Sequence, residues 1–133
     1  RDAFIENRNR IITASDNITF LRMNSLALSR FRHQNFDLIW VDGAHGYPTV
    51  CCDITNAIRL LSSNGILMCD DVWTKISRSD AMYSSYASWQ TLSSYTDAGI
   101  IDTKLFRKRL GFNHLSNEKY ISFSRLRRDH LNR

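Results

Sequence analysis

The stretch that decides the fold is FDLIWVDGAHGYPTVCCDITNAIRLLSSNGILMCDDVW, residues 36–73. Its first part contains the continuous apolar run 38–41, which is typical of a parallel strand covered on both faces. A second short apolar run follows at 66–69. Between the runs, apolar residues recur at the spacing of one helix face, at Val50, Ile54, Ala57, Ile58 and Leu61. Strand, helix and strand in this order predict a βαβ unit.

Local signals predict both ends of the helix in this unit. Pro48 suits the first turn of a helix, where its missing N–H costs nothing. Asn64-Gly65 predicts the stop, with Gly65 in a left-handed cap conformation. The helix should therefore lie between these two points.

Acidic side chains follow both predicted strands. Asp42 ends the first strand, with His45 three residues later, and Asp70 and Asp71 end the second. Loops after neighbouring parallel strands open on the same edge of a sheet, where ligands bind. Three carboxylates held close together raise one another's pKa, and a divalent cation removes that penalty. Oxygen ligands favour Mg²⁺, Ca²⁺ or Mn²⁺ over zinc, although an Asp at a strand end is also a common helix cap.

Weaker patterns predict the remaining elements. Helices are expected at 1–14, 25–31 and 79–95. Strands are expected at 17–23, 103–110 and 119–126, the last two as an antiparallel pair. Ile121 and Phe123 lie on one face of the last strand.

The composition is that of an ordinary soluble globular domain, with 133 residues, 43% hydrophobic and 23% charged. No apolar run approaches the ~18 residues that a membrane span needs, and no signal-peptide pattern is present. The three cysteines are odd in number and two are adjacent, which indicates a reducing, cytoplasmic setting rather than a disulfide framework. The chain begins at Arg1 rather than Met, so we expect it to be a piece of a longer protein.

Positive charge gathers near the C-terminus. Residues 1–100 hold nine Lys/Arg and ten Asp/Glu, whereas residues 101–133 hold nine and three, a net of +6. A basic segment of this kind could face nucleic acid, an anionic substrate or a membrane surface. The favoured interpretation is a solvated face.

The motifs in residues 36–73 resemble the metal-dependent branch of the class I S-adenosylmethionine methyltransferases. The shared pattern is a strand followed by Asp-Gly-x-His-x-Tyr, a helix containing Asp-Ile, and a Gly before a strand that ends in Asp-Asp. The pattern is similar to that of the macrolide and sugar O-methyltransferases, which include the macrocin and mycinamicin enzymes, and more distantly to catechol O-methyltransferase. Residues 17–31 match the third strand and following helix of that fold more loosely.

The resemblance implies a set of site residues. Asp42, Asp70 and Asp71 would bind Mg²⁺ or another hard divalent cation. His45 would be the general base, with a structural histidine as the alternative. Asn24 and Ser25, together with Asp42, would contact S-adenosylmethionine.

The resemblance also implies a fold that this chain fills only in part. The expectation is an α/β, Rossmann-like doubly wound sheet, mostly parallel, with a C-terminal antiparallel strand pair. The Gly-rich cofactor loop after the first strand and the acid after the second are absent from residues 1–133. The chain would therefore be one partial methyltransferase domain lacking the first two strands, with a metal and catalytic half at 17–75 and the C-terminal helix and strand pair at 76–133. A genuine truncated variant is the alternative.

The implied function is Mg²⁺-dependent O-methylation of a hydroxyl on a small molecule or sugar. One alternative is a catalytically inactive, methyltransferase-like binding module whose basic C-terminal face contacts nucleic acid or another anionic partner. Another is a metal-dependent hydrolase that reuses the same acids. The sequence leaves the methyl acceptor and the oligomeric state open.

Overall fold

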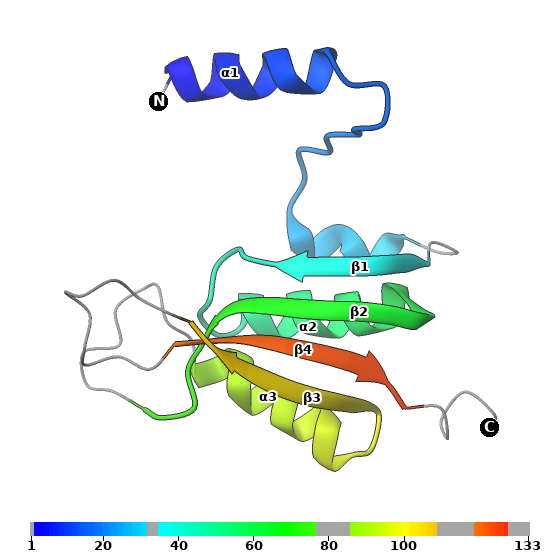
Figure 1. Ribbon diagram of the computed structural model, residues 1–133, viewed down its shortest axis with the longest axis vertical. Coiled ribbons are helices and arrows are strands. Elements are labelled where there is room, and N and C mark those ends of the chain that lie inside the picture. Colours follow the sequence, from blue (N-terminus) through cyan, green and yellow to red (C-terminus); the bar gives the residue numbers. More distant parts are fainter. Residues whose placement is uncertain (1, 32–34, 77–85, 109–118, 128–133) are drawn as a thin grey trace.

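A computed structural model describes residues 2–31, 35–76, 86–108 and 119–127 (Figure 1). In chain order its elements are α1 (Asp2–Thr13), the 3-10 helix η1 (Ser25–Arg30), β1 (Phe36–Val41), α2 (Thr49–Leu60), β2 (Leu61–Val72), α3 (Tyr86–Asp97), β3 (Ile101–Arg107) and β4 (Tyr120–Leu126).

The predicted βαβ unit is confirmed. β1 and β2 are parallel neighbours, with Val41 opposite Cys69, and α2 connects them. The apolar stripe of α2 faces the sheet, because Val50, Ile54 and Ala57 are buried in the core. As expected, the carboxyl ends of β1 and β2 therefore lie at the same edge of the sheet.

The four strands form a mixed sheet in the order β1-β2-β4-β3. β3 and β4 form the predicted antiparallel pair, and β4 lies between β3 and β2, antiparallel to both. Because β4 is antiparallel to both of its neighbours, β1, β2 and β3 all run in the same direction, and the sheet is mostly parallel as expected, with β4 as its antiparallel strand.

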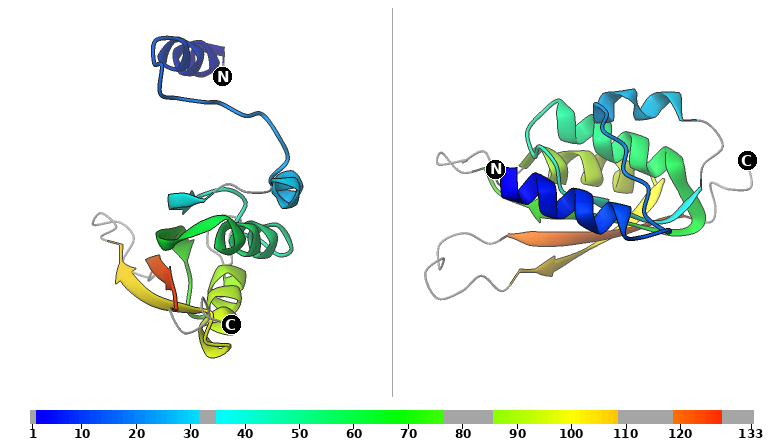
Figure 2. Two further views of the ribbon diagram at one scale, coloured as in Figure 1. Left: turned by 90° about the vertical axis from the view of Figure 1, so that its right-hand side faces the viewer. Right: turned by 90° about the horizontal axis from the view of Figure 1, so that it is seen from above.

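The helices η1, α2 and α3 gather on one face of the sheet (Figure 2). On β4, that face presents the fully buried Ser122 and Ser124, while Ile121 and Phe123 point to the opposite face. The Ser124 hydroxyl lies 2.9 Å from the Thr103 hydroxyl of β3, so the small polar side chains are satisfied under the helix layer. A doubly wound sheet carries helices on both faces. In the described ranges no helix covers the face opposite η1, α2 and α3.

The predicted strand at 17–23 is not formed, and these residues have no regular secondary structure. A strand needs a neighbour for its backbone hydrogen bonds, and none of the four described strands pairs with this segment. The segment connects α1 to η1 and exposes Ile18, Phe20 and Leu21. The Arg8 guanidinium of α1 stacks 4.6 Å from the ring centre of Phe20.

Gly65 does not cap the helix as predicted. It lies within β2, which begins immediately after α2 and is much longer than the expected 66–69. A Cβ at Gly65 would lie 2.7 Å from the Phe36 carbonyl oxygen and 2.8 Å from the Leu61 side chain. The glycine is therefore needed for close approach of β1 and β2 rather than for a left-handed turn.

The remaining expectations are met approximately. The helix at 1–14 and the short helix at 25–31 are confirmed as α1 and η1. Of the predicted helix 79–95, the part from residue 86 onward is confirmed as α3, and residues 77–85 lie outside the described chain. No helix in the described ranges is long and apolar enough to cross a membrane.

Candidate functional site

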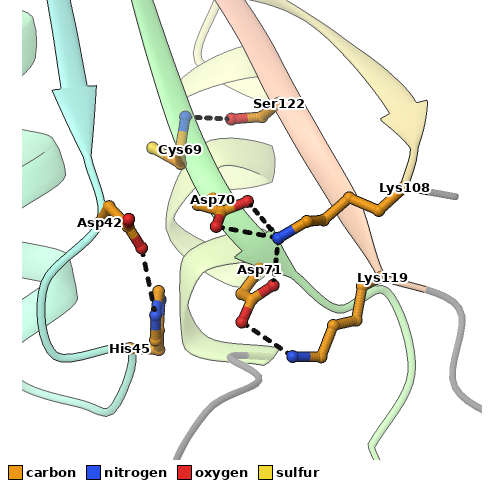
Figure 3. Close-up of polar contacts among 8 residues, drawn as sticks. All are labelled: Asp42, His45, Cys69, Asp70, Asp71, Lys108, Lys119 and Ser122. Carbon is orange, nitrogen blue, oxygen red and sulfur yellow. Dashed lines mark hydrogen bonds and ion pairs between the residues drawn. The ribbon is translucent and has the colours of Figure 1, made fainter. Parts of the chain in front are cut away.

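Asp42 and His45 lie in the loop that follows β1, at the carboxyl edge of the sheet (Figure 3). The Nε2 atom of His45 is 3.8 Å from Oδ1 of Asp42. The imidazole is only 11% exposed, whereas the carboxylate is 50% exposed. The loop therefore brings the carboxylate and the imidazole close together, and the roles expected of Asp42 and His45 stay predictions.

Asp70 and Asp71 lie at the end of β2, where the strand departs from regular geometry. Cys69 pairs with Ser122 of β4, but the next pair is Val72 with Tyr120, so β2 carries one extra residue. Asp71 has a positive φ of 49°, a left-handed conformation that Asp tolerates better than most residues. This is a β-bulge, which re-aims side chains that would otherwise alternate between faces.

Two lysines engage both carboxylates of this pair. The Nζ atom of Lys108 donates to Oδ1 and Oδ2 of Asp70 at 2.7 and 2.9 Å, and to Oδ1 of Asp71 at 2.7 Å. The Nζ atom of Lys119 donates to Oδ2 of Asp71 at 2.8 Å. Lys108 follows β3 and Lys119 precedes β4, so the C-terminal hairpin supplies both cations (Figure 3). We call these four residues the Asp–Lys cluster.

In the Asp–Lys cluster, the carboxylates and the ammonium groups stabilise one another's charged forms. Partial burial raises the pKa of Asp71, but hydrogen bonds and charge from Lys108 and Lys119 outweigh it, and the pKa lies below its ordinary value. Partial burial lowers the pKa of Lys108, but Asp70 and Asp71 outweigh it and hold that pKa above its ordinary value. Asp71 and Lys108 are therefore both charged at neutral pH.

The described residues do not fit the predicted magnesium site. Asp70 and Asp71 are occupied by ammonium groups, and Asp42 lies beside the imidazole of His45. Among the described residues, no three His, Cys, Asp or Glu side chains come together in a way that could hold a metal ion. The sequence pattern did not show these contacts, because the lysines that neutralise the acids lie 37 to 48 residues further along the chain, and metal binding by Asp42, Asp70 and Asp71 stays a prediction.

A cavity of about 410 Å³ adjoins Asp42 at the open edge of β1. Its polar wall residues are Ser25 of η1, Asp42 after β1, and Asp53 of α2, and apolar side chains of β1 also line it. The Oδ1 atom of Asp53 is buried and accepts no hydrogen bond within the described structure. Ligand cavities of ~300–1,000 Å³ with apolar walls and few polar groups are typical of cofactor sites.

This cavity fits part of the set predicted to contact S-adenosylmethionine. Ser25 and Asp42 both line it, and a sulfonium cation suits a wall that carries two carboxylates. Asn24 has a structural task, because its side-chain oxygen accepts a hydrogen bond from the Leu26 N–H at 3.0 Å and begins η1. Its contact with the cofactor stays a prediction.

Sequence reasoning missed three residues at this edge of the sheet. Lys108 and Lys119 were counted only as part of a basic segment, although they flank the two strands of a predicted hairpin. Asp53 entered the sequence analysis only as the first residue of the Asp-Ile pair in the shared motif and was given no role, yet it lines the cavity. A charged side chain adjoining an apolar stripe is the available signal for a cavity wall.

Comparisons with known proteins agree with this architecture. Residues 2–72 match the model of a family described as a methyltransferase domain. The cofactor-bound Rv0187 protein from MTB is similar in structure, with a TM-score of 0.57 and 18% identity, over 76% of this chain and 44% of that one. The S-adenosylhomocysteine-bound methyltransferase PaMTH1 from Podospora anserina has a TM-score of 0.55 and 21% identity, over 94% and 56%.

A Clostridium thermocellum protein described as a candidate rRNA-methylase has a TM-score of 0.59 and 12% identity, over 96% of this chain and 72% of that one. The sequence has no significant match among curated proteins. At these identities the structural likeness shows the fold, and the chain spans about half the length of Rv0187 and PaMTH1. The family model covers more than half of the chain. The protein therefore belongs to the methyltransferase domain family.

Proposed function

We propose that the protein is an S-adenosylmethionine-dependent methyltransferase that methylates a hydroxyl oxygen of a small molecule or sugar. The observation that carries this proposal is the Asp42–His45 pair beside the 410 Å³ cavity at the carboxyl edge of β1. Membership of the methyltransferase domain family supports the same reaction class. No divalent metal is part of the proposal, because Asp70 and Asp71 already have lysine partners.

Ser25, Asp42 and Asn24 are the proposed cofactor residues. S-adenosylmethionine supplies an electrophilic methyl group when it is bound. The half-exposed Asp42 carboxylate can accept hydrogen bonds from the cofactor, and its Oδ1 atom lies 3.8 Å from Nε2 of His45. The buried, unpartnered Oδ1 of Asp53 lies in the same cavity wall, where a donor or a positive charge would satisfy it.

His45 is the proposed general base. A histidine can take a hydroxyl proton near neutral pH, and Asp42 would hold the imidazole in place and stabilise the imidazolium that forms. The low exposure of His45 limits the orientations open to its ring. The acceptor hydroxyl would approach from the side of the rim opposite the cofactor, so that the methyl group is transferred in line.

Calorimetric titration with S-adenosylhomocysteine tests cofactor binding directly. The protein should bind it, and Asp42→Asn should weaken that binding. Asp102→Asn is a matched control, because this carboxylate of β3 is exposed and paired with Arg127, which directly follows β4. No binding by the protein, or equal binding by both variants, would contradict the proposal.

The second candidate function is an inactive, methyltransferase-like module that binds single-stranded nucleic acid. The observation that favours it is a groove of about 760 Å³ on β3 and β4. This groove combines the aromatic rings of Phe106 and Phe123 with Lys104 and Arg125, a composition suited to bases and phosphates. Binding to an RNA oligonucleotide should then weaken steeply with salt, and salt-independent or absent binding would discard this candidate.

A further inference from the structure

The ammonium group of Lys108 uses its full bonding capacity inside the protein. A lysine ammonium has three N–H donors and no acceptor. Lys108 has three carboxylate oxygens within 2.7 to 2.9 Å, two from Asp70 and one from Asp71. No donor is left over for a substrate, so Lys108 acts as an internal counter-ion.

The backbone holds both lysines in register at this place. The N–H of Lys108 donates to the carbonyl oxygen of Lys119 at 2.8 Å, which continues the β3–β4 pairing by one step. The two ammonium groups thus start from adjacent positions of one hairpin. Since β4 is the direct neighbour of β2, the hairpin delivers them to the end of the strand that carries the acids.

The end of β2 is shaped to receive them. In a regular strand Asp70 and Asp71 would point to opposite faces of the sheet. The extra residue and the left-handed backbone of Asp71 allow both carboxylates to reach Lys108. A backbone conformation of this kind is costly unless the surrounding contacts compensate for it, and here four charge-assisted hydrogen bonds do so.

We infer that Lys108 and Lys119 take the place of a divalent metal at the end of β2, so that this site is neutralised by the chain itself. A cation entering between Asp70 and Asp71 would have to break the four contacts to the lysines. It would then lie beside two ammonium groups, whose charge repels it. Only the consequence for catalysis rests on the proposed methyl transfer, because metal binding is measured without turnover.

Terbium luminescence tests this inference, because Trp73 lies two residues from Asp71 and can sensitise a bound ion. The wild-type protein, a Lys108→Met/Lys119→Met variant and a Lys75→Met/Lys104→Met control are titrated with Tb³⁺. The control removes the same charge from two exposed lysines. The wild type and the control should show no saturable site, and the Lys108/Lys119 variant should gain one that disappears when Asp70→Asn is added.

A saturable site in the wild type that Asp70→Asn abolishes would overturn the inference, because the lysines would then yield to the metal. No gain of a site in the folded Lys108/Lys119 variant would also overturn it, since the freed acids would not be metal ligands at all. Circular dichroism checks folding, and the single Lys108→Met variant, which removes three of the four contacts and frees Asp70, replaces the double one if the latter does not fold, with the same readings.

A chelator experiment separates this inference from the proposed function. Methyl transfer by the wild type should be unchanged by EDTA, and loss of transfer that Mg²⁺ restores would overturn the inference while supporting the enzyme. Failure to bind S-adenosylhomocysteine would remove the enzyme proposal and leave the terbium result standing.

Discussion

His45 Nε2 lies 3.8 Å from Asp42 Oδ1, and both side chains come from one short loop after β1. This separation is longer than a hydrogen bond, yet short enough for the carboxylate to stabilise a positive charge on the ring. The Asp42 carboxylate is therefore placed to support the role of general base that is proposed for His45. Catalytic contacts in proteins without substrate are often long in this way.

His45→Ala should reduce methyl transfer by about 10²–10⁴-fold if His45 is the general base. The affinity for S-adenosylhomocysteine should not change, because the proposed cofactor residues are intact. Turnover across a range of pH, with the calorimetric affinity measured in parallel, gives both quantities. An equal loss of affinity and turnover would mark His45 as a structural residue of the loop.

Asp71→Asn should lower the free energy of unfolding at neutral pH by about 1–3 kcal/mol, because Lys108 and Lys119 lose charged partners. The folded-state pKa of Asp71 lies below its ordinary value, so its contribution is complete above about pH 4 and is lost as the pH falls through the folded-state pKa. Urea unfolding of both proteins across the acid range measures this difference.

The two unfolding free energies should converge at acid pH if Asp71 is the titrating group. Lys108 affects the free energy of unfolding at the alkaline end of the pH range. Because its folded-state pKa is raised, its contribution to stability is complete below about pH 10 and is lost as the pH rises through the folded-state pKa. Asp102→Asn serves as the control, since its ion pair with Arg127 is exposed and should contribute little. A constant difference between wild type and Asp71→Asn at every pH would contradict the assignment.

The Cys69 thiol should resist modification in the folded protein. Burial raises the pKa of Cys69 to about 12, with a smaller opposing effect of its hydrogen bond with Ser122 and a further increase from the Asp53 charge. The thiolate is the reactive species, so a thiol reagent at mildly alkaline pH should label Cys69 only after unfolding. Cys51 and Cys52 are partly exposed and serve as internal comparisons. Rapid labelling of Cys69 in the native state, read by peptide mass mapping, would show that the strand opens there.

Gly65→Ala should destabilise the fold by about 1–3 kcal/mol, because the added methyl group cannot be accommodated without moving backbone. The clash is with the Phe36 carbonyl oxygen, at 2.7 Å from the new carbon. Gly46→Ala is the matched control, since no atom lies within 4 Å of its added carbon. Thermal or urea unfolding compares the two variants. Equal stabilities would contradict a close approach of β1 and β2 at Gly65.

The local part of the fold could be predicted from the sequence. The apolar run of β1 and the stripe of α2 carry their own periodicities, and the C-terminal hairpin carries alternation and turn residues. The segment 17–23 has a strand-like sequence as well, yet strand formation depends on a partner that no local pattern supplies. The place of β4 between β2 and β3 was equally non-local, because alternation within one segment shows a strand and not its neighbours.

The site was predictable where one loop builds it and not where distant segments meet. Asp42 and His45 are three residues apart, and their approach follows from the strand end. The partners of Asp70 and Asp71 depend on the return of the hairpin and on one extra residue in β2, neither of which is visible in the Asp-Asp dipeptide itself. Repelling acids implied a cation at that place, and the described structure has the ammonium groups of Lys108 and Lys119 there.

The extra residue at the end of β2 bears on how functional residues are carried between relatives. An alignment of Asp-Asp dipeptides matches letters, whereas the direction of the second side chain is set by the bulge and by the left-handed φ of Asp71. A relative with the same two letters in a regular strand would turn its second carboxylate to the other face of the sheet. Equivalence at this position therefore has to be judged from strand pairing. A role of the second acid can be transferred from one relative to another only where both proteins have the bulge.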